Sequence, residues 1–176
     1  MNQCRIIGLR TGVIVGILTV VLMLGFYFVD KRQFVISTFY TYIFYWVGMI
    51  WATGKAKATI APEERSYHNL LQTPFIVFLV ANVFYYAMMF IMFNWVDSSL
   101  MEVTKGFFNE LVDWVSKMPG NEDQKENFTK IKQDLNTSLN SYNLKSLSLE
   151  FANSLFKGFI LSVIITFFFT IRKSKI

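Results

Sequence analysis

The side chains most often used in catalysis are scarce in this sequence. His68 is the only histidine and Cys4 the only cysteine, so there is no second imidazole or thiol for a metal site and no partner for a disulfide. Gly54-Lys55-Ala56 matches only a fragment of a phosphate-binding loop, because no Ser or Thr follows the lysine. No Ser–His–Asp arrangement is readable. We therefore expect a protein that is not an enzyme, with no catalytic residue, metal or cofactor.

Polar side chains near the middle of two apolar segments are the strongest candidates for a site. These candidates are Tyr42, Tyr45, Asn82 and Tyr86. An unpaired hydroxyl or amide is costly inside a bilayer, so one interpretation is a cluster of interhelical hydrogen bonds worth about 0.6–2 kcal/mol each. The alternative is a small cavity for a lipid- or quinone-sized molecule. Asp, Glu, Lys and Arg are absent from these midpoints, which argues against a proton relay or charge-coupled transport.

Small residues form a second pattern, at a spacing of four. Near the N-terminus they are Gly8, Gly12 and Gly16, and near the C-terminus Gly158, Ser162 and Thr166, flanked by Ser154 and Thr170. Four residues is close to one helical turn, so each set lies on one helix face and allows another backbone to approach closely. Because both sets would lie at the same depth in a membrane, we expect the first and last helices to pack together, antiparallel. The alternative is that glycine is simply common in membrane helices.

Composition indicates the elements that carry these residues. Of the 176 residues, 53% are hydrophobic and 16% charged, against about 25% charged in an ordinary soluble domain. The apolar residues form four blocks, each near the roughly 20 residues that cross a bilayer core. The expected spans are residues 11–29, 34–54, 74–96 and 151–171. This excludes disorder, a basic nucleic-acid-binding domain and a disulfide-stapled secreted module.

The first block is too long for a usual signal peptide and lacks a small-x-small cleavage site, so we interpret it as a retained helix. The fourth is interrupted by Lys157, whose flexible stem can carry the ammonium group to the interface. We expect an all-α polytopic membrane protein, residues 1–176 forming a single membrane domain.

Basic residues are denser on the side that holds both termini, although Lys31 and Arg32 argue against this bias. It predicts that both termini are cytoplasmic.

Residues 97–150 are the one long segment outside the expected spans. Two runs of helical periodicity flank Pro119-Gly120-Asn121, which predicts an extracytoplasmic helical hairpin between the third and fourth spans. The two apolar stripes are Phe107, Leu111, Trp114 and Met118 in the first arm, and Phe128, Ile131, Leu135 and Leu139 in the second. One interpretation is that the arms bury these stripes on each other or on the membrane surface. The other is a docking site for a membrane or periplasmic protein.

Three stretches carry a resemblance to a known family. They are Ile7-Gly8-Leu9-Arg10-Thr11-Gly12-Val13-Ile14-Val15-Gly16, the stretch from Ser66-Tyr67 through Leu70-Leu71-Gln72-Thr73-Pro74-Phe75-Ile76-Val77 to Tyr85-Tyr86, and Gly158-Phe159-Ile160-Leu161-Ser162-Val163-Ile164-Ile165 before Arg172-Lys173. The chain resembles the family known as domain of unknown function 4199. The resemblance implies a four-span inner-membrane protein, mostly found in Bacteroidota, with a helical insertion before the last span. It implies no activity, because the family has none assigned.

Two functions remain open at this point. The first is a non-enzymatic, multi-pass protein of a bacterial inner membrane, acting as a subunit or accessory factor through helix and hairpin contacts. The second is a small permeation protein, or a lipid- or quinone-binding protein, that uses the tyrosine and asparagine cluster. The expected partners are membrane lipids and a protein bound through residues 97–150, and nucleic acid is not among them. The sequence leaves the oligomeric state open.

Overall fold

The structure is a computed structural model that describes residues 3–118, 125–138 and 144–171, and these residues form helices and short connections without a strand. In chain order the helical elements are α1 (Gln3–Val29), α2 (Lys31–Thr59), the 3-10 turn η1 (Pro62–Glu64), α3 (Tyr67–Ile91), the π-helical turn η2 (Met92–Val96), α4 (Leu100–Ser116), α5 (Lys125–Ser138) and α6 (Leu144–Ile171). Among the described residues, four helices are long and apolar enough to cross a membrane: α1, α2, α3 with η2, and α6. The all-α, four-span fold class is therefore confirmed.

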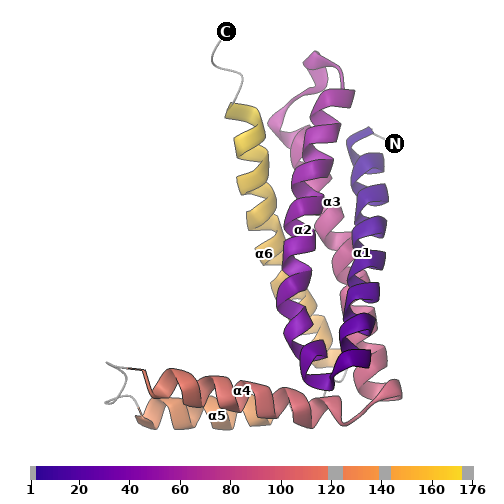
Figure 1. The fold of residues 1–176 in the computed structure, drawn as a ribbon. Helices are drawn as coiled ribbons and strands as arrows, with labels where there is room; N and C mark the ends of the chain where they lie inside the picture. The colour runs from indigo at the N-terminus through magenta and orange to yellow at the C-terminus, as the bar shows by residue number, and fades with distance from the viewer. Residues whose placement is uncertain (1–2, 119–124, 139–143, 172–176) are drawn as a thin grey trace.

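The four long helices lie alongside one another in a bundle (Figure 1), with the start of α1 and the end of α6 at the same end. α1 and α3 run in one direction, and α2 and α6 in the other. The last helix begins at Leu144, so residues 144–150, expected in the hairpin, belong to α6. The rest of that segment forms α4 and α5, which lie side by side across the opposite end of the bundle (Figure 1).

Local signals explain where two of the long helices begin. A single residue, Asp30, separates α1 from α2, and its carboxylate accepts a hydrogen bond from the backbone N–H of Arg32 at 3.1 Å. The Ser66 hydroxyl accepts the N–H of Asn69 at 3.2 Å and caps α3. Because this cap lies upstream, α3 begins before the predicted span, and Pro74 lies inside the helix.

The core is arranged around α3, which contacts α1, α2 and α6. One buried cluster occupies the middle and the terminal end of the bundle and includes Val15, Tyr45, Met49, Val77, Phe78, Ala81 and Ile165. A second lies at the hairpin end and consists of Met23, Phe34, Met88, Met89, Met92, Phe93 and Leu100. Since Leu100 is the first residue of α4, the second cluster anchors the start of the hairpin to the bundle.

The glycines of α1 lie against α3. A Cβ added at Gly12 would come within 2.8 Å of the Cβ of Val80, and one at Gly16 within 2.6 Å of the Phe84 ring. At Gly8 the nearest atom would be the carbonyl oxygen of Thr73, at 2.9 Å. The row of glycines is therefore the groove into which α3 packs.

The glycine in the row of small residues on α6 also faces α3. A Cβ at Gly158 would overlap the ring of Phe78. Ser162 and Thr166 are buried, and their hydroxyls donate to carbonyl oxygens of their own helix at 2.7 Å each. The prediction that α1 and α6 pack together through these faces is wrong, because α3 supplies the bulky side chains that occupy both grooves. Equal depth in the membrane does not make two helices neighbours.

Candidate functional site

Two of the four predicted polar side chains join helices by hydrogen bonds. The Tyr45 hydroxyl, on α2, donates to the carbonyl oxygen of Ala81 on α3 at 3.1 Å. The Asn82 amide, on α3, donates to the Ser154 hydroxyl on α6, and that hydroxyl donates in turn to the carbonyl oxygen of Phe151 at 2.9 Å. Polar groups that satisfy each other at this depth fix which helices are neighbours.

The other two predicted residues make aromatic contacts. The Tyr42 ring packs edge-on against Tyr45 at a centroid distance of 6.0 Å, and its side chain is exposed at the edge of the bundle. The Tyr86 ring packs edge-on against Phe151 on α6 at 5.5 Å. Sequence reasoning missed Thr19, whose buried hydroxyl on α1 lies beside the Tyr45 hydroxyl. A polar residue amid the apolar α1 segment was the available signal.

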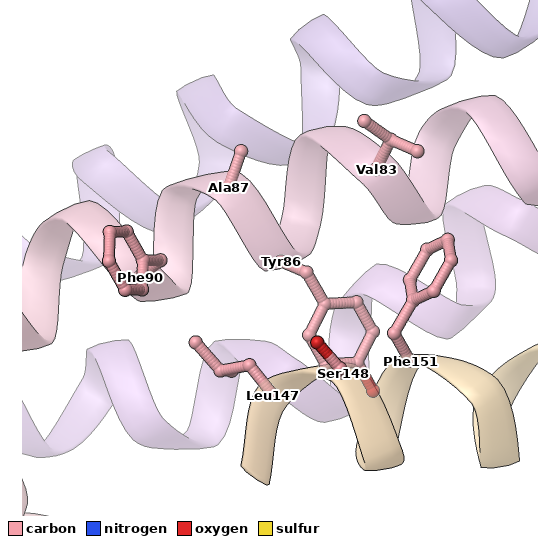
Figure 2. Close-up of a pocket in the computed structure, with 7 residues that line it drawn as sticks. All are labelled: Val83, Tyr86, Ala87, Phe90, Leu147, Ser148 and Phe151. Atoms are coloured by element: carbon pink, nitrogen blue, oxygen red, sulfur yellow. The ribbon is translucent and has the colours of Figure 1, made fainter. Parts of the chain in front are cut away.

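A groove lies between α3 and the start of α6, beside Tyr86. Its volume is about 360 Å³, which is within the usual range of small-molecule sites. It is lined by Val83, Tyr86, Ala87, Phe90, Leu147, Ser148 and Phe151. Figure 2 shows Tyr86 reaching from α3 toward α6, where Ser148 and Phe151 lie beside it. The lining is almost wholly apolar, so this α3–α6 groove suits an acyl chain or a flat apolar ring better than a charged group.

A half-buried acidic residue joins the bundle to the hairpin. The Asp97 carboxylate lies 2.6 Å from the Lys31 ammonium and accepts hydrogen bonds from the Tyr27 hydroxyl at 3.0 Å and from the N–H and hydroxyl of Ser99 at 3.0 and 2.7 Å. Its side chain is only 12% exposed. The Lys31 ammonium, and secondly Ser99, hold the pKa of this carboxyl well below its usual range. Asp97 is therefore ionised at any ordinary pH and fixes the start of α4.

A second and more exposed pair joins α4 to α2 about three turns beyond Leu100. The Arg32 guanidinium lies 2.5 Å from the Glu110 carboxylate and 5.9 Å from the centroid of the Phe107 ring. Sequence reasoning noted Lys31 and Arg32 only as charges that opposed the orientation bias. Two adjacent cations at a helix end were a signal that carboxylates pack against them.

The two arms of the hairpin pair through polar side chains. The Lys132 ammonium lies 2.5 Å from the Asp113 carboxylate, and the Asn109 amide donates to the side-chain oxygen of Asn136 at 3.2 Å. α5 therefore covers a polar flank of α4. The α4 stripe (Phe107, Leu111, Trp114 and Met118) is left partly uncovered: Trp114 is 62% exposed.

This pairing corrects one interpretation of the hairpin. Ile131 on α5 is also exposed, and so is Leu111 on α4, so complete mutual burial of both stripes does not occur in the described arms. The other described stripe residues, Phe107, Met118, Phe128 and Leu135, are half-buried. The charged and amide side chains that join the arms, Lys132 with Asp113 and Asn109 with Asn136, belong to neither stripe. Leu139 and Pro119-Gly120-Asn121 lie outside the described residues.

Within the described ranges, no group of three or more His, Cys, Asp or Glu side chains is arranged to hold a metal ion. The family described as "Protein of unknown function (DUF4199)" matches the chain over residues 10–170, nearly its whole length. No curated protein and no solved structure matches the chain. The structure thus offers two features with a possible function: the uncovered α4 stripe and the apolar α3–α6 groove.

Proposed function

Because the chain belongs to the DUF4199 family of proteins of unknown function, we propose a function from its geometry: it is a non-enzymatic membrane subunit or accessory factor that binds a partner through α4. The observation that carries the proposal is the uncovered α4 stripe. Asp97, just before α4, and Glu110, about two thirds of the way along it, bind α2, whereas Trp114, one turn beyond Glu110, contributes a largely exposed aromatic side chain. Exposed aromatic residues within a polar rim are typical of protein interfaces.

The position of the hairpin favours a partner that is itself in the membrane. α4 and α5 run across the end of the bundle (Figure 1), at the level where α1 turns into α2. A surface at that level meets either lipid headgroups or a neighbouring membrane protein. Residues 97–150 contain six Lys and nine Asp or Glu, and a net negative surface is repelled by anionic headgroups. We therefore favour a membrane protein as the partner.

The same proposal includes a subcellular location and a membrane orientation. It puts the protein in a bacterial inner membrane, with both termini in the cytoplasm and the hairpin outside, on the strength of the denser basic residues beside the termini. Alkaline phosphatase fused at Gly120 should be active and the same enzyme fused at Ile176 inactive. Activity at both sites would contradict an even number of spans.

Photo-crosslinking in native membranes tests the partner. A photoreactive amino acid at Trp114 should crosslink to one discrete protein, and the same group at Lys130, on the exposed face of α5, should not. Crosslinks from position 114 to lipid alone would show that α4 lies on the bilayer, and would contradict the proposal.

A deletion separates binding from folding. Removing residues 102–143, which leaves α6 whole because it begins at Leu144, and joining the ends with a short flexible linker should leave an inserted four-helix protein that has lost its partner. Degradation of this variant would mean that the hairpin is structural.

A second function is favoured by the α3–α6 groove, whose apolar lining beside Tyr86 fits a lipid- or quinone-sized molecule. Replacing Tyr42 and Tyr86 by Phe should leave partner crosslinking at position 114 unchanged. The same double variant should weaken binding of a photoreactive quinone or lipid in the groove, if that is the function. Equal binding by the double variant and the parent would contradict this second function.

A further inference from the structure

We propose that the end of the bundle opposite the hairpin binds the headgroup of an anionic phospholipid between Arg10 of α1 and Lys55 of α2. The two side chains line a hollow of about 290 Å³ between these helices. This site is separate from both the α4 stripe and the α3–α6 groove, and the inference does not depend on the function proposed above.

One face of each helix forms the hollow. On α1 the lining residues Ile6, Arg10 and Ile14 recur every four positions, and on α2 Trp51, Lys55 and Thr59 do the same. Because residues four apart lie above one another on a helix, each wall is a vertical row of side chains with its cation in the middle. The two helices run in opposite directions (Figure 1), so Arg10 and Lys55 come to the same level.

Neither cation has an acidic or hydrogen-bonding partner among the described residues, unlike Arg5, Lys57 and Arg65 at the same end. Arg5 donates to Gln72 at 2.8 Å, Lys57 to the carbonyl oxygen of Phe169, and Arg65 to the carbonyl oxygen of Ile60 at 3.2 Å. Within the described part of the chain, neither Arg10 nor Lys55 forms an ion pair, and no Asp or Glu lines the hollow. The Lys55 ammonium lies over the Trp51 ring, 4.9 Å from its centroid.

The hollow also continues toward the middle of the membrane as an apolar wall. Ile14 and Trp51 are each 54% exposed and lie one turn, about 6 Å, deeper than Arg10 and Lys55. A free phosphate compound would use the two cations but not this wall. A phospholipid uses both, because its phosphate sits at the interface and its acyl chains descend along the protein.

Fluorescence of Trp51 provides a local measurement in the intact chain. The protein is made with Trp51 as its sole tryptophan, by replacing Trp46, Trp95 and Trp114 with Phe, and is placed in phosphatidylcholine vesicles. Brominated phosphatidylglycerol and brominated phosphatidylcholine are each titrated as quenchers over the same range of mole fractions. We expect half-maximal quenching of Trp51 at a mole fraction of the anionic lipid at least about fivefold lower than that of the zwitterionic one.

Charge variants test the assignment to these two side chains. Arg10→Gln with Lys55→Gln should abolish the preference for the anionic lipid. Arg5→Gln with Arg65→Gln removes the same charge from the same end and should retain it. If both double variants lose the preference, the attraction belongs to the whole basic surface and the proposed site is wrong.

Two further measurements need only the parent protein, so their results can be interpreted even if a variant fails to fold. Equal quenching of Trp51 by both lipids would overturn the proposal. Inorganic phosphate at millimolar concentration should leave the preference unchanged. If phosphate abolishes it, the hollow binds a soluble phosphate compound, and the assignment to a lipid is wrong.

Discussion

Where α1 meets α3, each glycine accepts one particular neighbour: Val80 lies against Gly12 and Phe84 against Gly16. Where α4 meets α2, two charge pairs, Lys31 with Asp97 and Arg32 with Glu110, add to the apolar packing of Leu100 against Phe34. Shape fixes the inside of the bundle at every turn, whereas charge fixes the hairpin at only two described points. The first kind of contact specifies the fold, and the second leaves the end of α4 beyond Glu110 available to another molecule.

The largest effect should come from filling a glycine groove. Gly12→Leu forces a branched side chain into the space of Val80 and should lower the free energy of unfolding by about 3 kcal/mol, since overpacking of a tight core costs this much. Gly25→Leu, in the same helix, meets open space and should change it by less than about 1 kcal/mol. Unfolding in mixed detergent micelles measures both. Equal losses would mean that α1 and α3 are not in close contact.

Next in size is the hydrogen bond between α3 and α6. Asn82→Ala leaves Ser154 without its interhelical donor and should cost about 0.6–2 kcal/mol in the same unfolding measurement. Asn127→Ala, at an exposed position on α5, should stay within about 0.5 kcal/mol of the parent. A loss no larger than that of the control would show that Asn82 does not join the helices.

The joint at Asp97 should respond to acid. Its folded pKa lies below that of the unfolded chain, about 3.9, so its contribution is complete above that pH and is lost as the pH falls through the folded pKa. Spin labels at Val29 and Lys117 report the position of α4. Their distance distribution should be narrow at pH 7 and should broaden in Asp97→Asn at the same pH. Broadening of the parent already at pH 6 would contradict the role of Asp97.

The smallest effect belongs to the pair between Arg32 and Glu110. Its side chains are 51% and 61% exposed, and exposed pairs couple by about 0–1 kcal/mol. A double-mutant cycle with Arg32→Gln and Glu110→Gln should give a coupling in that range, and it should fall further in high salt. A coupling above about 2 kcal/mol would mean that α4 is held by a desolvated pair.

The sequence predicted the fold class and the family, and both are confirmed. Hydropathy over about 20 residues is a local property, so it locates membrane helices without knowledge of their neighbours. The small faces of α1 and α6 were also visible, because a row of glycines indicates that something approaches closely. The identity of that neighbour was not visible, since Val80, Phe84 and Phe78 resemble lipid-facing residues in a linear sequence.

The candidate site was predicted less completely. Tyr45 donates to a backbone carbonyl, at Ala81, and no side-chain pattern marks a backbone acceptor. The α3–α6 groove uses Leu147, which sequence reasoning assigned to the hairpin segment of residues 97–150. Exposure of the α4 stripe depends on how α4 is rotated against α5. In that rotation Asp113 of α4 meets Lys132 of α5. The hydrophobic periodicity of a segment does not indicate which distant segment its side chains contact.

The one-residue turn at Asp30 makes α1 and α2 adjacent in the sequence, so both helices are synthesised before any residue of α4. Arg32 precedes Glu110 by 78 residues, and at about 5–20 residues per second the delay before that carboxylate exists is about 4–16 s. During this interval Lys31 and Arg32 lack the two carboxylates, of Asp97 and Glu110, that pair with them in the fold. Synthesis of Asp97 and then Glu110 ends that exposure, so the order of translation makes α4 the element that completes the α1–α2 pair.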